Sequence, residues 1–283
     1  MLRVAIAVWL SAGAAHAASH RGAPGRAARP PARTCPARCA NPPLFATKKP
    51  PPLTAVDAEV LKLCPVRAGD RVEPTEVRAF FDAHLSSGAA SDQRLLDAVA
   101  AAAPWARTAS SRAGFLAQIW SGPARRNAFT RVLCGDDFDT DEPGGLHLEA
   151  RYLDLERKGR LCYAGPAHGG PLHDGKPCAN GLCLIAWRGT RGFSCGAQVS
   201  GGFIEGQDAI DLLAAGTRAW SACCTGGASG QARAPNGSGA RLRDGGLYGG
   251  PEGPVFQIWC GERNGRPGIA MFSPAHATPD CGP

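Results

Sequence analysis

Twelve cysteines constrain the fold of this 283-residue chain more than any other feature of its sequence. In an exported chain their even number favours disulfides over free thiols, although spacing alone does not give the pairing. Zinc is the alternative for the short spacings 35–39 and 178–183, but neither has a matching second pair with a histidine at zinc-site spacing. We therefore expect a disulfide-stapled fold with no metal and no cofactor. The twelve are Cys35, Cys39, Cys64, Cys134, Cys162, Cys178, Cys183, Cys195, Cys223, Cys224, Cys260 and Cys281.

Residues 1–17 have the pattern of a secretory signal peptide. Arg3 supplies a short positive region, residues 4–15 form an apolar run, and Ala15-His16-Ala17 fits a cleavage site. No other stretch approaches the roughly 18 uncharged apolar residues that a membrane span needs. The pattern predicts a secreted or periplasmic protein without a membrane span.

Residues 18–52 are rich in Pro, Ala and Arg and poor in large apolar groups, which predicts a disordered basic arm. Residues 1–52 hold eight basic residues and no acid, so subtracting them from the total charge of +7 leaves residues 53–283 at −1. The overall charge is therefore no argument that the folded part binds nucleic acid. The arm is either a solubilising leader or an element attracted to phosphates and anionic surfaces.

Residues 53–120 have the periodicity of a helical region. Thr54 and Ser91 are candidate caps of two helices, and another helix begins near Pro74. The run FLAQIW at residues 115–120 adds an apolar turn.

After residue 125, short apolar runs alternate with glycine-rich turns. Helical patterns at residues 147–159 and 206–220 interrupt these runs. Residues 226–250 are glycine-rich and predict a long loop. Helices first and mostly strands afterwards predict an α+β protein. The predicted strands are FTRVLCG, RLCYAG, GLCLIAWRG, QVSGGFI, VFQIWCG and GIAMFS.

His147 is the first candidate for chemistry because it follows Gly144-Gly145 and opens a predicted helix. Glycines let a turn bring its backbone near a ligand, and a helix N-terminus offers N–H groups to an anion. A histidine placed there can transfer a proton to or from a phosphate ester. The alternative is an ordinary, half-exposed histidine at a helix start.

Four segments, NAFTRVLCGD, GGLHLEARY, VSGGFIEGQDAIDLLAAGTRAW and IAMFSPAHATPDC, occur in this order along the chain. Together they resemble EndoU-like endoribonucleases, a family that includes bacterial EndoU domains and the coronavirus uridylate-specific enzyme. The similarity covers about residues 121–281, and its most specific element is GGLH with the preceding Val-x-Cys-Gly-Asp strand. The resemblance implies a nuclease domain over residues 121–283, built from antiparallel sheets with flanking helices.

The resemblance implies cleavage of RNA without a metal, by attack of a 2′-hydroxyl on the adjacent phosphate to leave a 2′,3′-cyclic phosphate. In the family, two histidines usually act as base and acid, and a lysine steadies the charge of the phosphate. Residues on late strands help to hold the uridine. This division of labour fits general acid–base chemistry with electrostatic support.

Only part of this set is present here. His147 matches the histidine of the GGxH motif, whereas Arg131 occupies the position of the other histidine. Arginine stays protonated and cannot be a general base, but its planar fork matches phosphate oxygens. The expected lysine is missing from residues 195–198. We therefore expect His147 and Arg131 to be catalytic, with Gly145 and Ser273 as substrate-binding residues.

Three hypotheses follow. The first is an exported EndoU-like RNA endonuclease whose activity is weakened or lost, with RNA as its partner and no nucleotide cofactor. An inhibitor or immunity protein is a further candidate partner. The second is a non-catalytic protein of the same fold that binds RNA, a nucleotide or a protein. The third is a disulfide-rich extracellular or envelope protein without a role in nucleic-acid chemistry.

Overall fold

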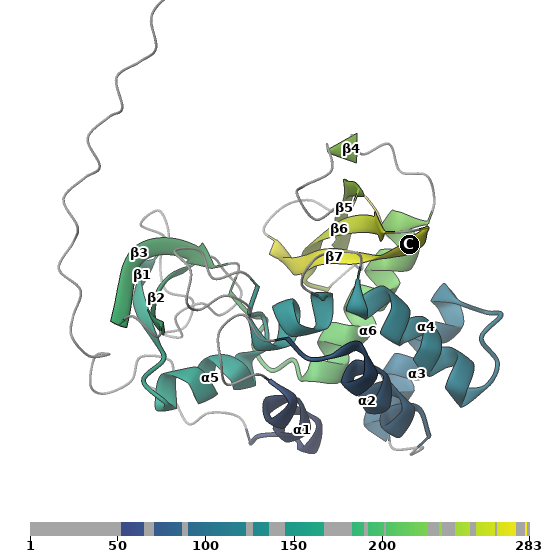
Figure 1. Cartoon of the computed structure of the whole chain (residues 1–283), viewed down its shortest axis with the longest axis horizontal. Coiled ribbons are helices and arrows are strands. Elements are labelled where there is room, and N and C mark those ends of the chain that lie inside the picture. Colours follow the sequence, from purple (N-terminus) through teal and green to yellow (C-terminus); the bar gives the residue numbers. More distant parts are fainter. Residues whose placement is uncertain are drawn as a thin grey trace, which may run out of the picture. The chain divides into compact units, whose positions relative to one another are not determined.

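A computed structural model places helices in the first part of the described chain and most of the strands after them (Figure 1). The predicted signal peptide and all but the last residue of the predicted arm lie outside the described residues. The structure describes residues 52–64, 71–86, 90–122, 127–135, 145–166, 183–189, 192–200, 202–225, 232–233, 241–249, 253–263, 265–275 and 281.

Four helices open the described chain. Thr54 caps the first of them as predicted, because its hydroxyl accepts a hydrogen bond of 3.1 Å from the backbone N–H of Asp57. The third begins at Ala90, so Ser91 lies inside its first turn and the cap predicted there is wrong. The helices are α1 (Ala55–Leu63), α2 (Pro74–Ser86), α3 (Ala90–Ala102) and α4 (Ala109–Ser121).

The apolar turn predicted at residues 115–120 of the helical region forms the second half of α4. Thr108 and Ser111 start this helix with a capping box. The N–H of Ser111 donates to the Thr108 hydroxyl at 3.1 Å, and the Ser111 hydroxyl accepts from the N–H of Thr108 at 3.0 Å. Serine here replaces the usual glutamate or glutamine, so the box is weakly marked in the sequence.

The ring of His84 joins three of these helices. Its Nδ1 lies 3.1 Å from a carboxylate oxygen of Asp92 in α3, and its Nε2 lies 3.0 Å from one of Glu59 in α1. His84 is thus held by structural contacts between helices.

Residues Thr130–Cys134 form a short π-helical segment, η1, so the strand predicted for FTRVLCG is wrong. The Asn127 side-chain oxygen accepts from the N–H of Thr130 at 2.6 Å, and its amide nitrogen donates to the Val72 carbonyl at 2.6 Å. The Thr130 hydroxyl accepts from the N–H of Val72 at 3.0 Å. These long-range bonds override the weak preference of β-branched residues for strands.

The next part of the chain is a helix followed by the first sheet. The helix, α5, occupies Glu149–Arg157, within the predicted helix at residues 147–159, but it begins two residues after His147. The sheet has the order β1-β2-β3, and both pairings are antiparallel. Its strands are β1 (Leu161–Pro166), β2 (Cys183–Gly189) and β3 (Gly192–Ser200). The first two lie at the predicted runs RLCYAG and GLCLIAWRG, whereas β3 lies mostly before the predicted run QVSGGFI and shares only residues 198–200 with it.

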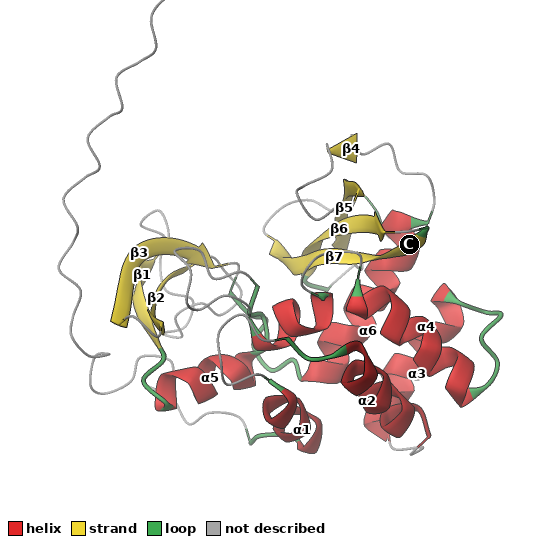
Figure 2. Ribbon diagram, viewed as in Figure 1, coloured by secondary structure: helices red, strands yellow, loops and turns green. Residues whose placement is uncertain are grey.

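A second helical segment leads into the second sheet, which has the order β4-β5-β6-β7 and is also antiparallel (Figure 2). The helical part is α6 (Ala209–Ala219) followed by the π-helical segment η4 (Trp220–Cys224). The strands are β4 (Ala232–Arg233), β5 (Arg241–Gly249), β6 (Val255–Arg263) and β7 (Arg266–Ala275).

The long loop predicted over residues 226–250 is wrong where β4 and β5 form. Strand β5 pairs with β6 along its whole length, from Arg241 opposite Glu262 to Gly249 opposite Val255. A register shift lies between Asp244 and Gly246. The glycines at this shift therefore belong to an irregularity of the sheet. Sequence alone does not distinguish such glycines from the glycines of a loop.

One hydrophobic cluster runs through the helices and the second sheet. The ring of Trp120 in α4 meets the ring of Phe272 in β7 edge to face at 6.3 Å, and its Nε1 donates to the Thr217 hydroxyl of α6 at 3.1 Å. The ring of Phe272 also stacks on Phe256 of β6 at 4.6 Å. The core therefore continues across residue 120, from the helical region into the residues that follow it.

Among the described residues, three disulfides connect elements that are distant in the sequence, which confirms a disulfide-stapled α+β fold with antiparallel sheets. They are Cys64–Cys134, Cys223–Cys281 and Cys224–Cys260. The first joins the end of α1 to the end of η1. These bonds are consistent with an oxidising location outside the cytoplasm. Among the described helices, none is long and apolar enough to cross a membrane.

Candidate functional site

The GGLH motif lies against the backbone of η1. The N–H of Leu146 donates to the carbonyl of Arg131 at 2.7 Å, and the N–H of His147 donates to the carbonyl of Val132 at 2.7 Å. Gly145 and Leu146 both have left-handed backbone conformations, with φ of 73° and 70°. This turn brings Arg131 and His147, which are 16 residues apart in the sequence, to one place in the fold.

Gly145 has no room for a side chain. A Cβ atom built on it would lie 1.9 Å from the carbonyl oxygen of Arg131, far inside van der Waals contact. Its positive φ also disfavours other residues. The role predicted for Gly145 was substrate binding, and the structure gives it a packing role between the motif and η1.

The ring of His147 is buried, with 4% of its surface exposed, so the alternative of a half-exposed histidine is wrong. Its Nδ1 lies 2.8 Å from the carbonyl oxygen of Gly202. A carbonyl only accepts hydrogen bonds, so Nδ1 carries the proton and Nε2 of the neutral ring is the acceptor. Nε2 makes no hydrogen bond to any residue that the structure describes.

Burial lowers the pKa of His147 from 6.5 to about 4, because a low-dielectric interior disfavours the charged ring. The hydrogen bond to Gly202 opposes this shift, and the positive charge of Arg131 adds to it. His147 is therefore neutral at physiological pH. In this state the ring can accept a proton at Nε2, but it has no second proton to give.

Arg131 supplies a positive charge beside this ring. Its side chain is half-buried, and its Nε is a buried donor without a hydrogen-bond partner among the described residues. A buried donor that lacks a partner is costly, and an anion at this position would satisfy it. Arg131 and His147 together offer a cation next to a neutral proton acceptor.

Ser273, the fourth predicted site residue, lies apart from this arrangement. Ser273 is buried in β7, opposite Gln257 of β6, and no described contact joins it to Arg131 or His147. His168, His173 and His276 lie outside the described residues. Within the described part of the chain, Arg131, Gly145 and His147 are thus the predicted site residues that the fold brings together.

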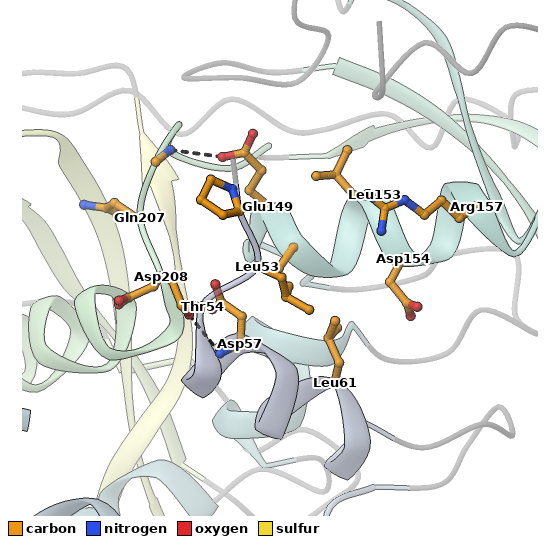
Figure 3. Close-up of a pocket in the computed structure, with 13 residues that line it drawn as sticks. Leu53, Thr54, Asp57, Leu61, Glu149, Leu153, Asp154, Arg157, Gln207 and Asp208 are labelled. Atoms are coloured by element: carbon orange, nitrogen blue, oxygen red, sulfur yellow. Dashed lines mark hydrogen bonds between the residues drawn. The ribbon is translucent and has the colours of Figure 1, made fainter. Parts of the chain in front are cut away.

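A separate pocket of about 200 Å³ lies where α1, α5 and α6 begin (Figure 3). Asp57 of α1 accepts from the N–H of Ala209 at 2.9 Å, and Glu149 of α5 accepts from the N–H of Gly206 at 3.0 Å. Burial raises the pKa of Asp57. The lining is Pro52, Leu53, Thr54, Asp57, Leu61, Glu149, Ala150, Leu153, Asp154, Arg157, Gly206, Gln207 and Asp208.

Sequence reasoning did not find this pocket, because its walls come from segments about 90 and 150 residues apart. The lining includes four acidic residues and one arginine, a balance that repels phosphate. Asp57 and Glu149 hold the starts of neighbouring elements in place, as carboxylates near helix N-termini commonly do. Neither Arg131 nor His147 lines this pocket.

Comparison with known proteins adds no family to this description. No protein-family model matches the chain, and no curated protein matches it.

Proposed function

We propose that this chain is an exported EndoU-like endoribonuclease, secreted or periplasmic. It cleaves RNA by attack of a 2′-hydroxyl on the adjacent phosphate and leaves a 2′,3′-cyclic phosphate. His147 is the general base, and Arg131 binds the phosphate. Three of the four segments on which the resemblance rests meet at His147, which supports the proposal.

The single observation that carries the proposal is the neutral His147 ring held next to Arg131. Nδ1 is committed to the carbonyl of Gly202, so Nε2 is the atom that takes the proton from the 2′-hydroxyl. The 2′-oxygen then forms a bond to phosphorus, and the bond from phosphorus to the 5′-oxygen breaks. The 5′-oxygen leaves as a hydroxyl after it receives a proton from solvent.

Arg131 acts on the charge of the phosphate. Its guanidinium donates to phosphate oxygens and stabilises the negative charge that builds up as the 2′-oxygen attacks. A base with a pKa of about 4 is fully deprotonated at neutral pH but accepts a proton weakly. Together with a leaving group protonated by solvent, this predicts cleavage that is about 100-fold or more slower than with two matched groups.

The test uses oxidised full-length protein without its signal peptide and a fluorogenic RNA that contains a single uridine. We expect His147→Gln and Arg131→Gln each to lower kcat/KM by about 100-fold, the range for a positioned base or a charge-stabilising group. His84→Gln is the matched control, because that histidine contacts carboxylates between helices and lies in another part of the fold.

Two further readouts distinguish this reaction from cleavage by a contaminating nuclease. The product should carry a 2′,3′-cyclic phosphate, and a substrate with 2′-deoxyuridine at the cleavage position should stay intact. Equal cleavage by the wild-type protein and His147→Gln would end the assignment of His147 as the base.

The second candidate is a non-catalytic protein that binds RNA, a nucleotide or a protein partner. The observation that favours it is the burial of His147, of which only 4% is exposed to a substrate. It predicts salt-sensitive binding of RNA with no cleavage at any pH between 5 and 8. Binding that Arg131→Gln weakens, without cyclic phosphate in the products, would establish this function in place of the first.

A further inference from the structure

Trp105 is an exposed tryptophan in the turn between α3 and α4. It is 67% exposed, and the other large hydrophobic side chain exposed among the described residues is Leu53. The indole meets the ring of Phe115 in α4 edge to face, with 5.9 Å between the ring centroids and 85° between the planes. Phe115 itself is buried. Trp105 is therefore anchored by one contact while two thirds of its surface faces solvent.

Two arginines near this tryptophan in the chain, Arg107 and Arg112, have no acidic partner among the described residues. The Nε of Arg112 donates to the carbonyl of Ala106 at 3.1 Å, which fixes the side chain against the turn. Arg107 is two residues after Trp105 and is exposed. Neither arginine forms an ion pair with any residue that the structure describes.

The charge of the surrounding sequence has the same sign. Residues 98–135 contain five arginines, no lysine and no acidic residue. This segment begins before Trp105 and ends after Arg131, the arginine of the candidate site. The exposed indole thus belongs to a positively charged stretch of the chain.

We propose that Trp105, Arg107 and Arg112 form a binding subsite for one nucleotide of a single-stranded nucleic acid. The base stacks on the indole, and the guanidinium groups pair with the adjoining phosphates. This inference rests on the proposed function for the identity of the strand as RNA. No described contact joins Trp105 to Arg131 or His147, so the subsite holds a different nucleotide from the one that is cleaved.

A membrane surface fits these residues less well. Binding at a membrane interface uses a helix that presents several apolar side chains on one face. The apolar residues of α4 are instead buried in the core, among them Leu116 and Ile119. A single aromatic plane with two unpaired arginines matches the alternation of base and phosphate in a nucleic acid.

The experiment measures binding of a fluorescein-labelled oligodeoxyuridine of 12 nucleotides by fluorescence anisotropy at several salt concentrations. This probe lacks the 2′-hydroxyl, so proposed cleavage does not affect its binding. Trp105→Ala should weaken binding about 5- to 150-fold, the range for loss of one base–aromatic stack, and Trp105→Phe should keep most of it. Arg107→Gln and Arg112→Gln should each flatten the slope of log K against log salt by about 0.7.

Arg266→Gln is the matched control, because Arg266 is an exposed arginine on another element, β7. Equal binding by the wild-type protein and Trp105→Ala would overturn the subsite and leave the proposed function intact. Absence of binding to the wild-type protein would also overturn the subsite. Loss of binding to phosphatidylserine vesicles in Trp105→Ala, with oligonucleotide binding unchanged, would overturn it in favour of a membrane.

The same proteins distinguish the subsite from the catalytic proposal. Binding that depends on Trp105, combined with no cleavage of an RNA of the same sequence, would support the subsite and overturn the proposed ribonuclease. Thermal unfolding of Trp105→Ala provides the check on folding, and we expect a small change because the side chain is mostly exposed.

Discussion

A single hydrogen bond from the ring of His147 to a backbone carbonyl decides which of its nitrogens can take a proton. The carbonyl of Gly202 holds the proton of the ring on Nδ1, and burial keeps the ring neutral. The residues of GGLH were recognisable in the sequence, but the partner of the ring was not, because Gly202 lies 55 residues further along the chain. Sequence therefore predicted the candidate residue, and only the fold shows which ring nitrogen carries the proton.

The depressed pKa of His147 predicts how stability depends on pH. Between about pH 6.5 and pH 4 the unfolded chain binds a proton at this residue and the folded chain does not, so stability falls as the pH falls through this window. The shift corresponds to about 3 kcal/mol at about 1.4 kcal/mol per pKa unit. Denaturant titrations at pH 4 and pH 7 should show that His147→Gln loses this part of the pH dependence. If the free energy of unfolding changes between pH 7 and pH 4 by the same amount in His147→Gln and in the wild-type protein, the ring is not buried and neutral.

Gly145→Ala should destabilise the protein by about 2–5 kcal/mol, since it combines a left-handed φ with a clash against the carbonyl of Arg131. Gly159→Ala is the control, because its φ of 62° is similar and nothing lies within 4 Å of the added Cβ. The control should cost about 1 kcal/mol, from backbone conformation alone. Chemical denaturation measures both free energies of unfolding, and equal losses would rule out the packing role of Gly145.

At the scale of elements, the disulfide Cys64–Cys134 joins α1 to η1, the segment that carries Arg131. Replacing both cysteines by alanine should lower the free energy of unfolding by about 2–5 kcal/mol. If the chain cleaves RNA as proposed, this change should also weaken cleavage, because the end of η1 loses its covalent anchor. Thermal unfolding and the fluorogenic assay measure the two effects.

The matched control replaces Cys224 and Cys260, whose bond closes a separation of 36 residues in place of 70. It should lower stability by a similar amount, since the entropy of loop closure changes slowly with length. Cleavage measured well below either unfolding temperature should fall more for the first pair. An equal fall would mean that the disulfide acts on stability only.

Helices with regular apolar spacing were the elements that sequence predicted well, as in α2 and α6. Segment η1 was predicted as a strand, because Thr130 and Val132 are β-branched and the bonds to Val72 are not visible in the local sequence. Strand β5 was predicted as a loop, because its glycines resemble turn residues until β6 pairs with them. Local patterns fail in both places where a distant backbone supplies the deciding hydrogen bonds.

At the scale of the whole molecule, residues before and after position 120 share one core. Thr130 and Asn127 bond to Val72, and Trp120 bonds to Thr217. A fragment of residues 121–283 should therefore lack cooperative unfolding, whereas residues 53–283 should unfold in one transition. Calorimetry and near-ultraviolet circular dichroism measure this difference.

The control for this comparison is residues 53–283 with Cys64→Ala and Cys134→Ala, which lacks the same disulfide as the shorter fragment. If this control and the fragment of residues 121–283 both unfold cooperatively, the hydrogen bonds and packing across position 120 are not needed for the fold. Residues 53–283, with or without the two substitutions, lack the basic arm and carry a formal charge of −1. Charge repulsion therefore does not account for a difference in how they unfold.

Cys223 and Cys224 are neighbours in η4, yet they bond to different partners, Cys281 and Cys260. Consecutive Cα atoms lie only about 3.8 Å apart, so an incompletely oxidised chain can exchange the two partners. The exchanged isomer has the same mass and the same number of thiols as the native one. Intact mass spectrometry and thiol titration therefore do not detect the mispaired isomer. Peptide mapping distinguishes the two isomers only after the chain is cleaved between positions 223 and 224.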